Sequence, residues 1–343
     1  MSLMPAITVA YPDPAMWDQF CDAHEHGHLL QHSQWGMLKR HTGWDDIRIG
    51  VYDDGELRAG AQVLTQRRYG LAMCYVPRGP LLCDDTLINQ ALVAAITQYA
   101  KRQRAVVVRY EPNVVSDSAH ASSYTRALVI ANAQTSLSKQ PQHTIWTPLD
   151  GDDDQLLKRM TKGHRADIKR AQREGVSVRI GHTDHDLDIF VAIMQHTGQR
   201  NHFAVHDRDY YKQVWQRFGN NNRATLLIAE HHGAPVAAAM IVANTHTACY
   251  LYGGSYEAAF ACGANHLIQW HALRWARDIG CQQYDAWGIP YPSHTPPDGE
   301  TPQMAGLIRF KKGFGGSDVS FLPAYPHVLM PWLYRIIQSR LPL

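Results

Sequence analysis

The chain contains the same series of segments twice, once in each half. The first copy begins with IRIGVYDDGELRAGAQVL at Ile47, and the second begins with TLLIAEHHGAPVAAAMIV at Thr225. In each copy an apolar run stops at a polar–Gly turn, at Gly55 or Gly233, and a second apolar run follows. This pattern predicts an antiparallel hairpin in both halves of the chain.

The segments after each hairpin also agree in order. A strand that ends in a Gly-containing loop comes next, MCYVPRGPL in one copy and CYLYGGSY in the other. A helical stretch follows (Thr86 to Lys101, and Cys262 to Arg277), and then one more strand (Val106 to Tyr110, and Gln282 to Asp285). We therefore expect two similar α/β domains with a ligand-binding cleft between them, in a protein that works as a monomer.

Composition excludes several classes of protein. The 343 residues suit two domains, and the net charge of +2 gives no overall basic signature for nucleic acid, so an anionic partner must be bound by local clusters. The six cysteines contain no CxxC pair, and the twenty histidines show no zinc-type spacing, so we expect reduced thiols and no metal. No signal peptide and no apolar run of about 18 residues is present, which favours a cytoplasmic protein.

The boundary between the domains is expected near Asp150. HTIWTPL (His143 to Leu149) has the pattern of a strand, and the acids of GDDDQLLKRM begin a helix after it. We predict a first domain of residues 1–149 plus 320–343, and a second of residues 150–319. The tail is predicted to be a helix that either docks on the first domain or touches a membrane surface. Its apolar face would hold Val328, Leu329, Trp332, Leu333, Ile336 and Ile337.

The densest group of cations lies in KRMTKGHRADIKRAQREGVSVR. Lys158, Lys162 and Arg165 have helical i, i+4, i+7 spacing, and Lys169 and Arg173 extend the same side. Such a stripe suits a phosphate backbone or a diphosphate. The alternative is a solvated helix whose cations pair with nearby acids.

Two further segments carry candidate ligand-binding groups. In LIRFKKGFGG, an aromatic followed by Lys311 and Lys312 can stack a base and meet phosphates, or the segment is a strand ending in a turn. In HTGQRNHFAVHDRDYY, cations and phenols either bind a phosphate or sugar or form a surface network. The chain has no GxSxG, GxxxxGK[ST] or HExxH motif. This profile favours an enzyme that positions two substrates and stabilises charge without a covalent intermediate.

Together these segments resemble the FemABX family of aminoacyl-tRNA-dependent peptidyltransferases. The similarity is carried in order by LLQHSQWGMLKRHTGW, YVPRGPL, VVVRYEPNV, RMTKGHRADIKRAQREGVSV, the stretch from Arg200 to Tyr211, CYLYGGS and LIRFKKGFGG. It implies an α/β (α+β) fold of two tandem GNAT-like domains, each a mixed twisted sheet flanked by helices. The second domain here has no long coiled-coil insertion, as in the compact members.

The resemblance also implies a reaction in which a side-chain amine of a cell-wall precursor attacks the aminoacyl ester of a tRNA. No covalent catalyst is needed, because the ester is already activated, and no cofactor is expected. The acceptor would be UDP-MurNAc-pentapeptide or a lipid-linked precursor. Phe310 and Lys311 match the family's Phe–Lys pair, where Lys311 would stabilise the oxyanion or the terminal phosphate.

The other site residues are implied in the same way. His206 stands where relatives have a basic residue, and Glu111 stands where relatives usually have Asp; Glu111 is either a base or a structural carboxylate. The expected precursor-binding residues are Lys39, Arg78, Glu111, Arg200, His206, Arg208, Tyr210, Tyr250 and Tyr252. The expected tRNA-binding residues are Lys162, Arg165, Lys169 and Lys312.

Two other functions are compatible with the same fold. One is an acyl-CoA-dependent N-acyltransferase, although FACGANHLIQW offers Gly263 without the usual second glycine of a CoA-binding turn. The other is a non-catalytic protein that binds tRNA or a nucleotide sugar, which the cations alone would permit.

Overall fold

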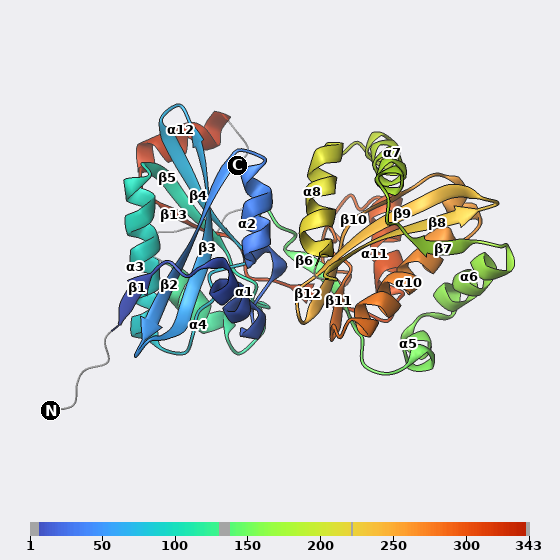
Figure 1. Ribbon diagram of the computed structural model, residues 1–343, viewed down its shortest axis with the longest axis horizontal. Helices are drawn as coiled ribbons and strands as arrows, with labels where there is room; N and C mark the ends of the chain where they lie inside the picture. Colours follow the sequence, from blue (N-terminus) through green and yellow to red (C-terminus); the bar gives the residue numbers. More distant parts are fainter. Residues whose placement is uncertain (1–6, 130–137, 221, 341–343) are drawn as a thin grey trace. The chain divides into compact units, whose positions relative to one another are not determined.

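The chain folds into two compact α/β units, each built on one mixed sheet (Figure 1). The computed structural model describes residues 7–129, 138–220 and 222–340. The first unit consists of residues 1–142 and 320–343, and the second of residues 143–319. The sequence placed the strand His143–Pro148 in the first domain, whereas in the structure it pairs with Gln283–Asp285 in the second unit.

The first unit has a six-stranded sheet in the order β1-β2-β3-β4-β5-β13. These strands are Thr8–Ala10, Trp44–Asp53, Glu56–Arg68, Leu71–Pro77, Ala105–Glu111 and Tyr325–Val328. Its helices are α1 (Pro14–Ala23), the 3-10 turn η1 (Leu29–Gln31), α2 (Ser33–Arg40), α3 (Thr86–Arg102), α4 (Ala121–Leu128) and α12 (Pro331–Arg340). One face of α3 enters the core, where Leu92 and Ile96 pack among Val63 and Val108. Full burial of one such side chain is worth about 1.5–3 kcal/mol.

The second unit has a seven-stranded sheet in the order β12-β6-β11-β10-β9-β8-β7. In chain order the strands β6 to β12 are His143–Pro148, Ser177–Ile180, Ala224–His231, Ala234–Ala243, Thr247–Ser255, Gln283–Asp285 and Ser317–Ser320. The helices α5 to α11 are Asp153–Arg159, Lys162–Arg173, Asp184–Asn201, Arg208–Gly219, Ala258–Ala261, Ala264–Asp278 and Pro302–Lys312. Helix α10 fills the core, with Leu267 and Leu273 packed among Leu227 and Ile241.

The two central hairpins share their turn geometry and their irregularity. Asp54 and Gly55 have φ of 47° and 83°, and His232 and Gly233 have φ of 52° and 78°. Positive φ at both central residues defines the type I′ turn, which matches the twist of the strands it joins. Each hairpin also shifts register once, between residues 51 and 52 in the first copy and between residues 229 and 230 in the second. These shifts fall at matching points just before the two turns, so the structure confirms the repeated architecture.

The basic segment forms two helices instead of one. Thr161 accepts a hydrogen bond from the backbone of His164 and caps a new helix, α6, after α5 has ended at Arg159. A cap of this kind fixes where a helix begins. The predicted i, i+4, i+7 stripe from Lys158 to Arg165 is therefore wrong, because Lys158 lies on α5.

Two other segments differ from expectation. LIRFKKGFGG is not a strand: Leu307 to Lys312 end α11, which begins at Pro302 after the cap of Thr301. In the tail, Val328 belongs to β13, which pairs with β5, so the predicted apolar face does not start there. On α12, Trp332 and Ile336 are exposed, and the side chain of Ile337 lies outside the described residues.

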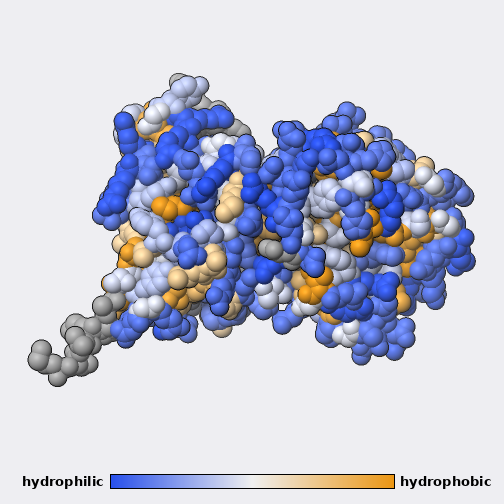
Figure 2. All heavy atoms as spheres, viewed as in Figure 1, coloured by the Kyte–Doolittle hydropathy of each residue, from blue (hydrophilic) through white to orange (hydrophobic). Residues whose placement is uncertain are grey.

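Most of the face shown in Figure 2 is hydrophilic. Among the helices that the structure describes, none is both long enough and apolar enough to cross a membrane.

Candidate active site

The sheet of the second unit opens where β10 and β11 separate. These parallel strands pair only from Thr247 to Cys249 on β10 and from Gln283 to Asp285 on β11. β10 then continues to Ser255 against β9. Helix α11 lies beside the opening, which leaves a small cavity. Its lining residues are Thr147, Tyr250, Gln269, Tyr284, Ala286, Phe310, Lys311 and Phe314. Its volume of about 10 Å³ is close to the room that one water molecule needs.

Lys311 is the charged group of this cavity. Its side chain is only 9% exposed, and Nζ donates to the carbonyl oxygens of Trp287 (3.1 Å) and Gly288 (2.7 Å). Burial lowers the pKa of Lys311 to about 8, although Asp285 acts in the opposite direction. The side chain therefore remains mostly protonated at pH 7, in surroundings that make its charge costly.

Asp285 organises the loop that holds Lys311. This buried carboxylate, at the end of β11, accepts hydrogen bonds from Thr144 Oγ1, from Trp146 Nε1 (3.2 Å) and from the backbone N–H of Trp287 (2.7 Å). Trp287, whose carbonyl accepts from Lys311, has φ of 59°, an uncommon conformation for a bulky residue. The strand end thus fixes the carbonyls that position the ammonium group.

Phenols close the other side of the cavity. Tyr284 donates to Gln269 Oε1 at 2.8 Å, and burial raises the pKa of Tyr284 well above its ordinary value. Burial likewise raises the pKa of Tyr250 to about 12. Both phenols stay protonated at neutral pH, so they act as neutral hydrogen-bonding groups and not as bases.

Two histidines that the sequence did not single out surround Phe310. His164 Nε2 lies 2.8 Å from the carbonyl oxygen of Phe310, and the rings of His266 and Phe310 are 5.1 Å apart. Burial and the neighbouring His164 lower the pKa of His266 to about 4. The neutral rings and Phe314 form an aromatic wall beside Lys311. No pattern in the sequence indicates this wall, because α6 and α10 are far apart along the chain.

A second group in the same unit joins α8 to β10. The hydroxyls of Tyr210 and Tyr252 are 3.1 Å apart, and the ring of His206 stacks on Tyr210 with centroids separated by 3.8 Å. Burial raises the pKa of Tyr210 to about 12 and that of Tyr252 well above its ordinary value. Asp207 accepts from the backbone of Tyr210 and so sets the start of α8. The structure therefore brings together three predicted residues, with the His206 ring exposed and the Tyr210 phenol buried behind it.

The two predicted arginines of this region are held by acids. Arg200 donates to Ser255 O at 2.8 Å and pairs with Glu257 at 3.2 Å. Arg208 pairs with Asp188 and Asp184 of α7. Both guanidinium groups thus have protein partners, which leaves fewer N–H donors for a phosphate.

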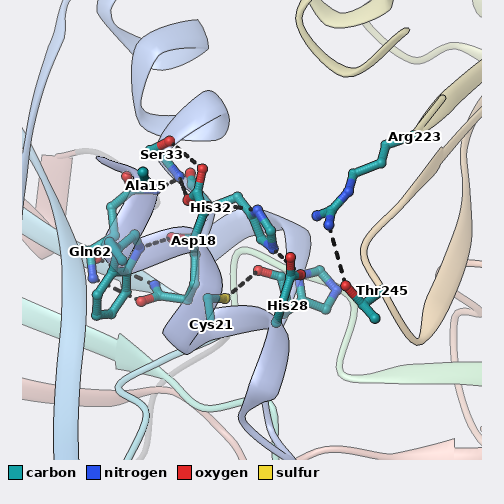
Figure 3. Close-up of polar contacts among 12 residues, drawn as sticks. Ala15, Asp18, Cys21, His28, His32, Ser33, Gln62, Arg223 and Thr245 are labelled. Carbon is teal, nitrogen blue, oxygen red and sulfur yellow. Dashed lines mark hydrogen bonds and ion pairs between the residues drawn. The ribbon is translucent and has the colours of Figure 1, made fainter. Parts of the chain in front are cut away.

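In the first unit, Lys39 lies near the end of α2. Its Nζ lies 4.8 Å from the ring centre of Trp35, and burial lowers the pKa of Lys39 to about 8. A buried polar network anchors the beginning of this helix (Figure 3). Asp18 accepts from both Ser33 N (2.7 Å) and Ser33 Oγ (2.6 Å), and the Gln62 amide donates to the His32 carbonyl at 2.9 Å. These bonds fix the start of the helix that carries Lys39.

Arg78 and Glu111 are buried at the end of the β4–β5 pair. Arg78 donates to Pro141 O at 2.8 Å, and its guanidinium lies 4.0 Å from the ring centre of Phe321. Glu111 accepts from Tyr75 Oη (2.7 Å) and from the backbone N–H groups of residues 139 and 140 (2.6 and 3.0 Å). Both carboxylate oxygens are engaged, which favours a structural role for Glu111 over that of a base.

The predicted tRNA-binding residues divide into two kinds. Lys162 and Lys169 are exposed on α6. Arg165 instead donates to backbone carbonyls at the end of α5, including that of Met160, and Lys312 donates to Ser293 Oγ at 2.6 Å. Lys312 is also exposed, but its ammonium group already has a hydrogen-bond partner within the protein.

Comparison with known proteins identifies the family. The model of the FemAB family matches residues 14–233 and 229–339. The chain belongs to the FemAB family. A relative named lipid II:glycine glycyltransferase, from Staphylococcus saprophyticus, is 25% identical over 94% of this chain and 93% of its own length. The predicted enzyme class is thereby confirmed: the chain is a transferase of the acyltransferase type.

Solved structures show the same fold. The crystal structure of FemX superposes with a TM-score of 0.86 at 23% identity, covering 96% of this chain and 100% of FemX. A tandem GNAT protein from the clavulanic acid biosynthesis pathway superposes with a TM-score of 0.56 at 12% identity, covering 94% of this chain and 98% of that protein. The predicted pair of GNAT-like domains is therefore confirmed.

Proposed function

We propose that this FemAB protein transfers an amino acid from aminoacyl-tRNA to the side-chain amine of a peptidoglycan precursor's stem peptide. The observation that carries the proposal is Lys311, a buried ammonium group held by two carbonyls at the open strand ends of the second unit. The relatives are named for glycine and lipid II, so glycine is the proposed donor group and the lipid-linked precursor the proposed acceptor. Charged tRNA is cytoplasmic, and we place the reaction on that side of the membrane.

The reaction needs charge stabilisation more than it needs a nucleophile. The acceptor amine attacks the ester carbonyl, a C–N bond forms, and the carbonyl oxygen becomes negatively charged. An ammonium group has three N–H donors, and Trp287 O and Gly288 O take two of those on Lys311. We assign the third to the oxyanion, where one such donor is worth about 3–4 kcal/mol. When the intermediate collapses, the C–O bond to the ribose breaks and the tRNA hydroxyl takes up the proton released by the amine.

The cavity itself is too small to hold an aminoacyl group. Since it has room for about one water molecule, we assign the reacting carbonyl to the cavity mouth, near Lys311 and Phe310. Phe310 is half-buried in the wall formed by His164 and His266, so its remaining surface can support the terminal adenine of the tRNA by stacking.

The precursor's diphosphate is assigned to the hydroxyls of Tyr210 and Tyr252, with His206 at the solvent edge. The hydroxyl pair at 3.1 Å is rigid and protonated, so it can donate to phosphate oxygens. In the first unit, Lys39 is the residue that we propose for precursor binding. Lys162 and Lys169 of α6 meet the tRNA backbone.

Because each chain already contains both copies of the domain, we propose that it works as a monomer.

The structure gives a reason to disfavour acyl-CoA as the donor. In a CoA-binding GNAT domain the helix that corresponds to α10 would present its N-terminus to the cofactor. Here a Cβ on Gly263, which precedes α10, would lie 2.8 Å from Asp167 O of α6, and Arg170 donates to Ala261 O. Helix α6 thus covers the position where the diphosphate of CoA would bind.

The test is a transfer assay with purified protein, radiolabelled glycyl-tRNA and either lipid II or UDP-MurNAc-pentapeptide, and a parallel reaction with labelled acetyl-CoA. We expect label from tRNA on lipid II, and its loss in Lys311→Met. The variant Arg309→Met removes an exposed cation from the same helix and should transfer normally. Transfer from acetyl-CoA alone would overturn the proposal, and so would full activity of Lys311→Met.

A further inference from the structure

Three potential metal ligands from two distant segments meet in the first unit. They are Glu25 and His26, in the turn after α1, and His120, the residue before α4. One ligand atom from each lies within 4.8 Å of the other two. The two histidines lie in widely separated parts of the sequence, so no motif spacing could reveal the group. Among the described residues no other set of three or more such side chains meets the same criterion.

His26 has an unsatisfied nitrogen in this cluster. Its Nε2 is buried and has no hydrogen-bond partner among the described residues. Its ring stands edge-on to His120 (centroids 5.1 Å apart, 75° between planes) and to Tyr124 (5.2 Å, 89°), so the ring is held in place. A buried nitrogen without a partner is unusual in a stable core and calls for an explanation.

The neighbouring His24 does not supply that partner. Its Nδ1 accepts from the backbone N–H of His26 at 3.0 Å, and its Nε2 lies 3.0 Å from Leu82 O. Both nitrogens of His24 are thus used in holding the turn. In contrast, the side chain of His120 makes no capping bond at the start of α4. Its Nε2 lies 3.4 Å from Glu25 Oε2.

We propose that Glu25, His26 and His120 form a binding site for a divalent transition-metal ion, with Zn²⁺ as the best fit. Two imidazoles and one carboxylate are a zinc ligand set, with water in the fourth position. Ligand atoms around a tetrahedral zinc lie about 3.3 Å apart, given bonds of about 2.0–2.1 Å. The His120–Glu25 separation already has that length. The other ligand atoms lie within 4.8 Å of one another, so binding the ion requires side-chain movements of up to about 1.5 Å.

The ion would join two loops that the backbone leaves unconnected. It would tie the turn after α1 to the start of α4, and so add to the hydrogen bond that Asn113 Nδ2 donates to His26 O at 3.3 Å. Zn²⁺ would also give His26 Nε2 the partner that the protein lacks. The site is therefore structural, and the proposed transfer reaction does not depend on it.

The test uses the full-length protein after removal of any affinity tag and of bound metal. Titration calorimetry with Zn²⁺, and visible absorption with Co²⁺, should show one ion per chain and a raised Tm. His120→Ala and Glu25→Gln should each weaken binding by more than about tenfold, since even supporting residues of metal sites contribute about 10–100-fold. The matched control is His231→Ala with His232→Ala, which removes two adjacent histidines from the second unit.

Each outcome decides the question. Loss of binding in the two cluster variants, with binding kept in the control, supports the site. Absence of Zn²⁺ binding by the wild-type protein at micromolar concentration overturns it, as does equal binding by all variants. His120→Ala is chosen because its backbone carbonyl still accepts from Ser123 Oγ and Tyr124 N, so the helix start should survive. Circular dichroism checks the fold of each variant.

Discussion

Replacing Lys311 with Met separates the catalytic role proposed for this residue from its structural role. The pKa of Lys311 falls from 10.5 to about 8 in the fold. Each pKa unit corresponds to about 1.4 kcal/mol, so the charged side chain costs the folded state about 3 kcal/mol at pH 7. Met fills nearly the same volume without the charge. It leaves the carbonyls of Trp287 and Gly288 without this donor, at a cost of about 2 kcal/mol for the pair.

The two effects nearly cancel, so Lys311→Met should be as stable as the wild type or more stable by about 1 kcal/mol. Transfer activity should nevertheless fall by about 10²–10³ in kcat, the usual loss for one oxyanion donor. A residue that is costly to the fold and essential to the reaction is expected at an active site.

The stability difference should depend on pH in a defined direction. Because the folded-state pKa of Lys311 lies below its unfolded-state value, the penalty is fully present below pH 8. It disappears as the pH rises from about 8 to 10.5. The wild type should therefore gain stability relative to Lys311→Met across that interval.

The assays are urea unfolding of wild type, Lys311→Met and Arg309→Met at pH 7 and pH 10, and single-turnover transfer from glycyl-tRNA. Arg309→Met controls for loss of an exposed cation from α11. A clear loss of stability in Lys311→Met at pH 7, with Arg309→Met unchanged, would show that the lysine is structural and refute this reasoning. A rise in wild-type activity through pH 8 that is absent in Lys311→Met would show that the neutral amine of Lys311 acts as a base.

Three other expectations rest on the described contacts. Tyr252→Phe removes the hydroxyl partner of Tyr210, so the KM for the precursor should rise about tenfold with little change in kcat. An unchanged KM would show that these phenols do not bind the acceptor. The double variant Lys162→Ala/Lys169→Ala should weaken tRNA binding and reduce the slope of log affinity against log salt by about 0.7–0.9 for each lysine. Filter binding at increasing salt concentration measures this slope. An unaltered slope would place the tRNA elsewhere. Burial opposes a charge on His32, but contacts with Cys21 and Asp22 raise the pKa of His32 to about 10. The stabilisation from this charge is complete below pH 6.5 and is lost as the pH rises through 10. The difference in unfolding free energy between wild type and His32→Gln should therefore be smaller at pH 9 than at pH 6. A constant difference would contradict the assignment.

Local signals in the sequence were sufficient to predict the repeated scaffold. The polar–Gly turns at Gly55 and Gly233 marked both hairpins, because a type I′ turn requires positive φ and few residues adopt it easily. The predicted helical stretches that begin at Thr86 and Cys262 likewise match α3 and α10. The start of α11 could have been found as well, since Thr301 followed by Pro302 is a common cap and first helical residue.

Contacts between distant segments could not be found in this way. The tail residues Tyr325 to Val328 form β13 only because β5, far earlier in the chain, offers a free edge. When this partner is unknown, Val328 fits the apolar face of the helix that follows equally well. Similarly, the wall around Phe310 depends on α6 and α10 packing together, which brings His164 and His266 to 4.7 Å between ring centres. Periodicity describes one element at a time and carries no information on which elements meet.

The two copies of the scaffold differ where the two parallel strands of each sheet end. In the first unit β4 and β5 pair as far as Pro77 and Glu111, and a bridge from Gly79 to Glu111 continues the closure. Glu111 and its bonds to residues 139 and 140 fill the end of that pair. In the second unit the corresponding strands part after Cys249, and Lys311 enters the opening. A closed sheet end satisfies its own polar groups, whereas an open one leaves donors for a ligand. Among the described residues, the two related frameworks therefore differ at this strand end: it is closed in the first unit and open in the second.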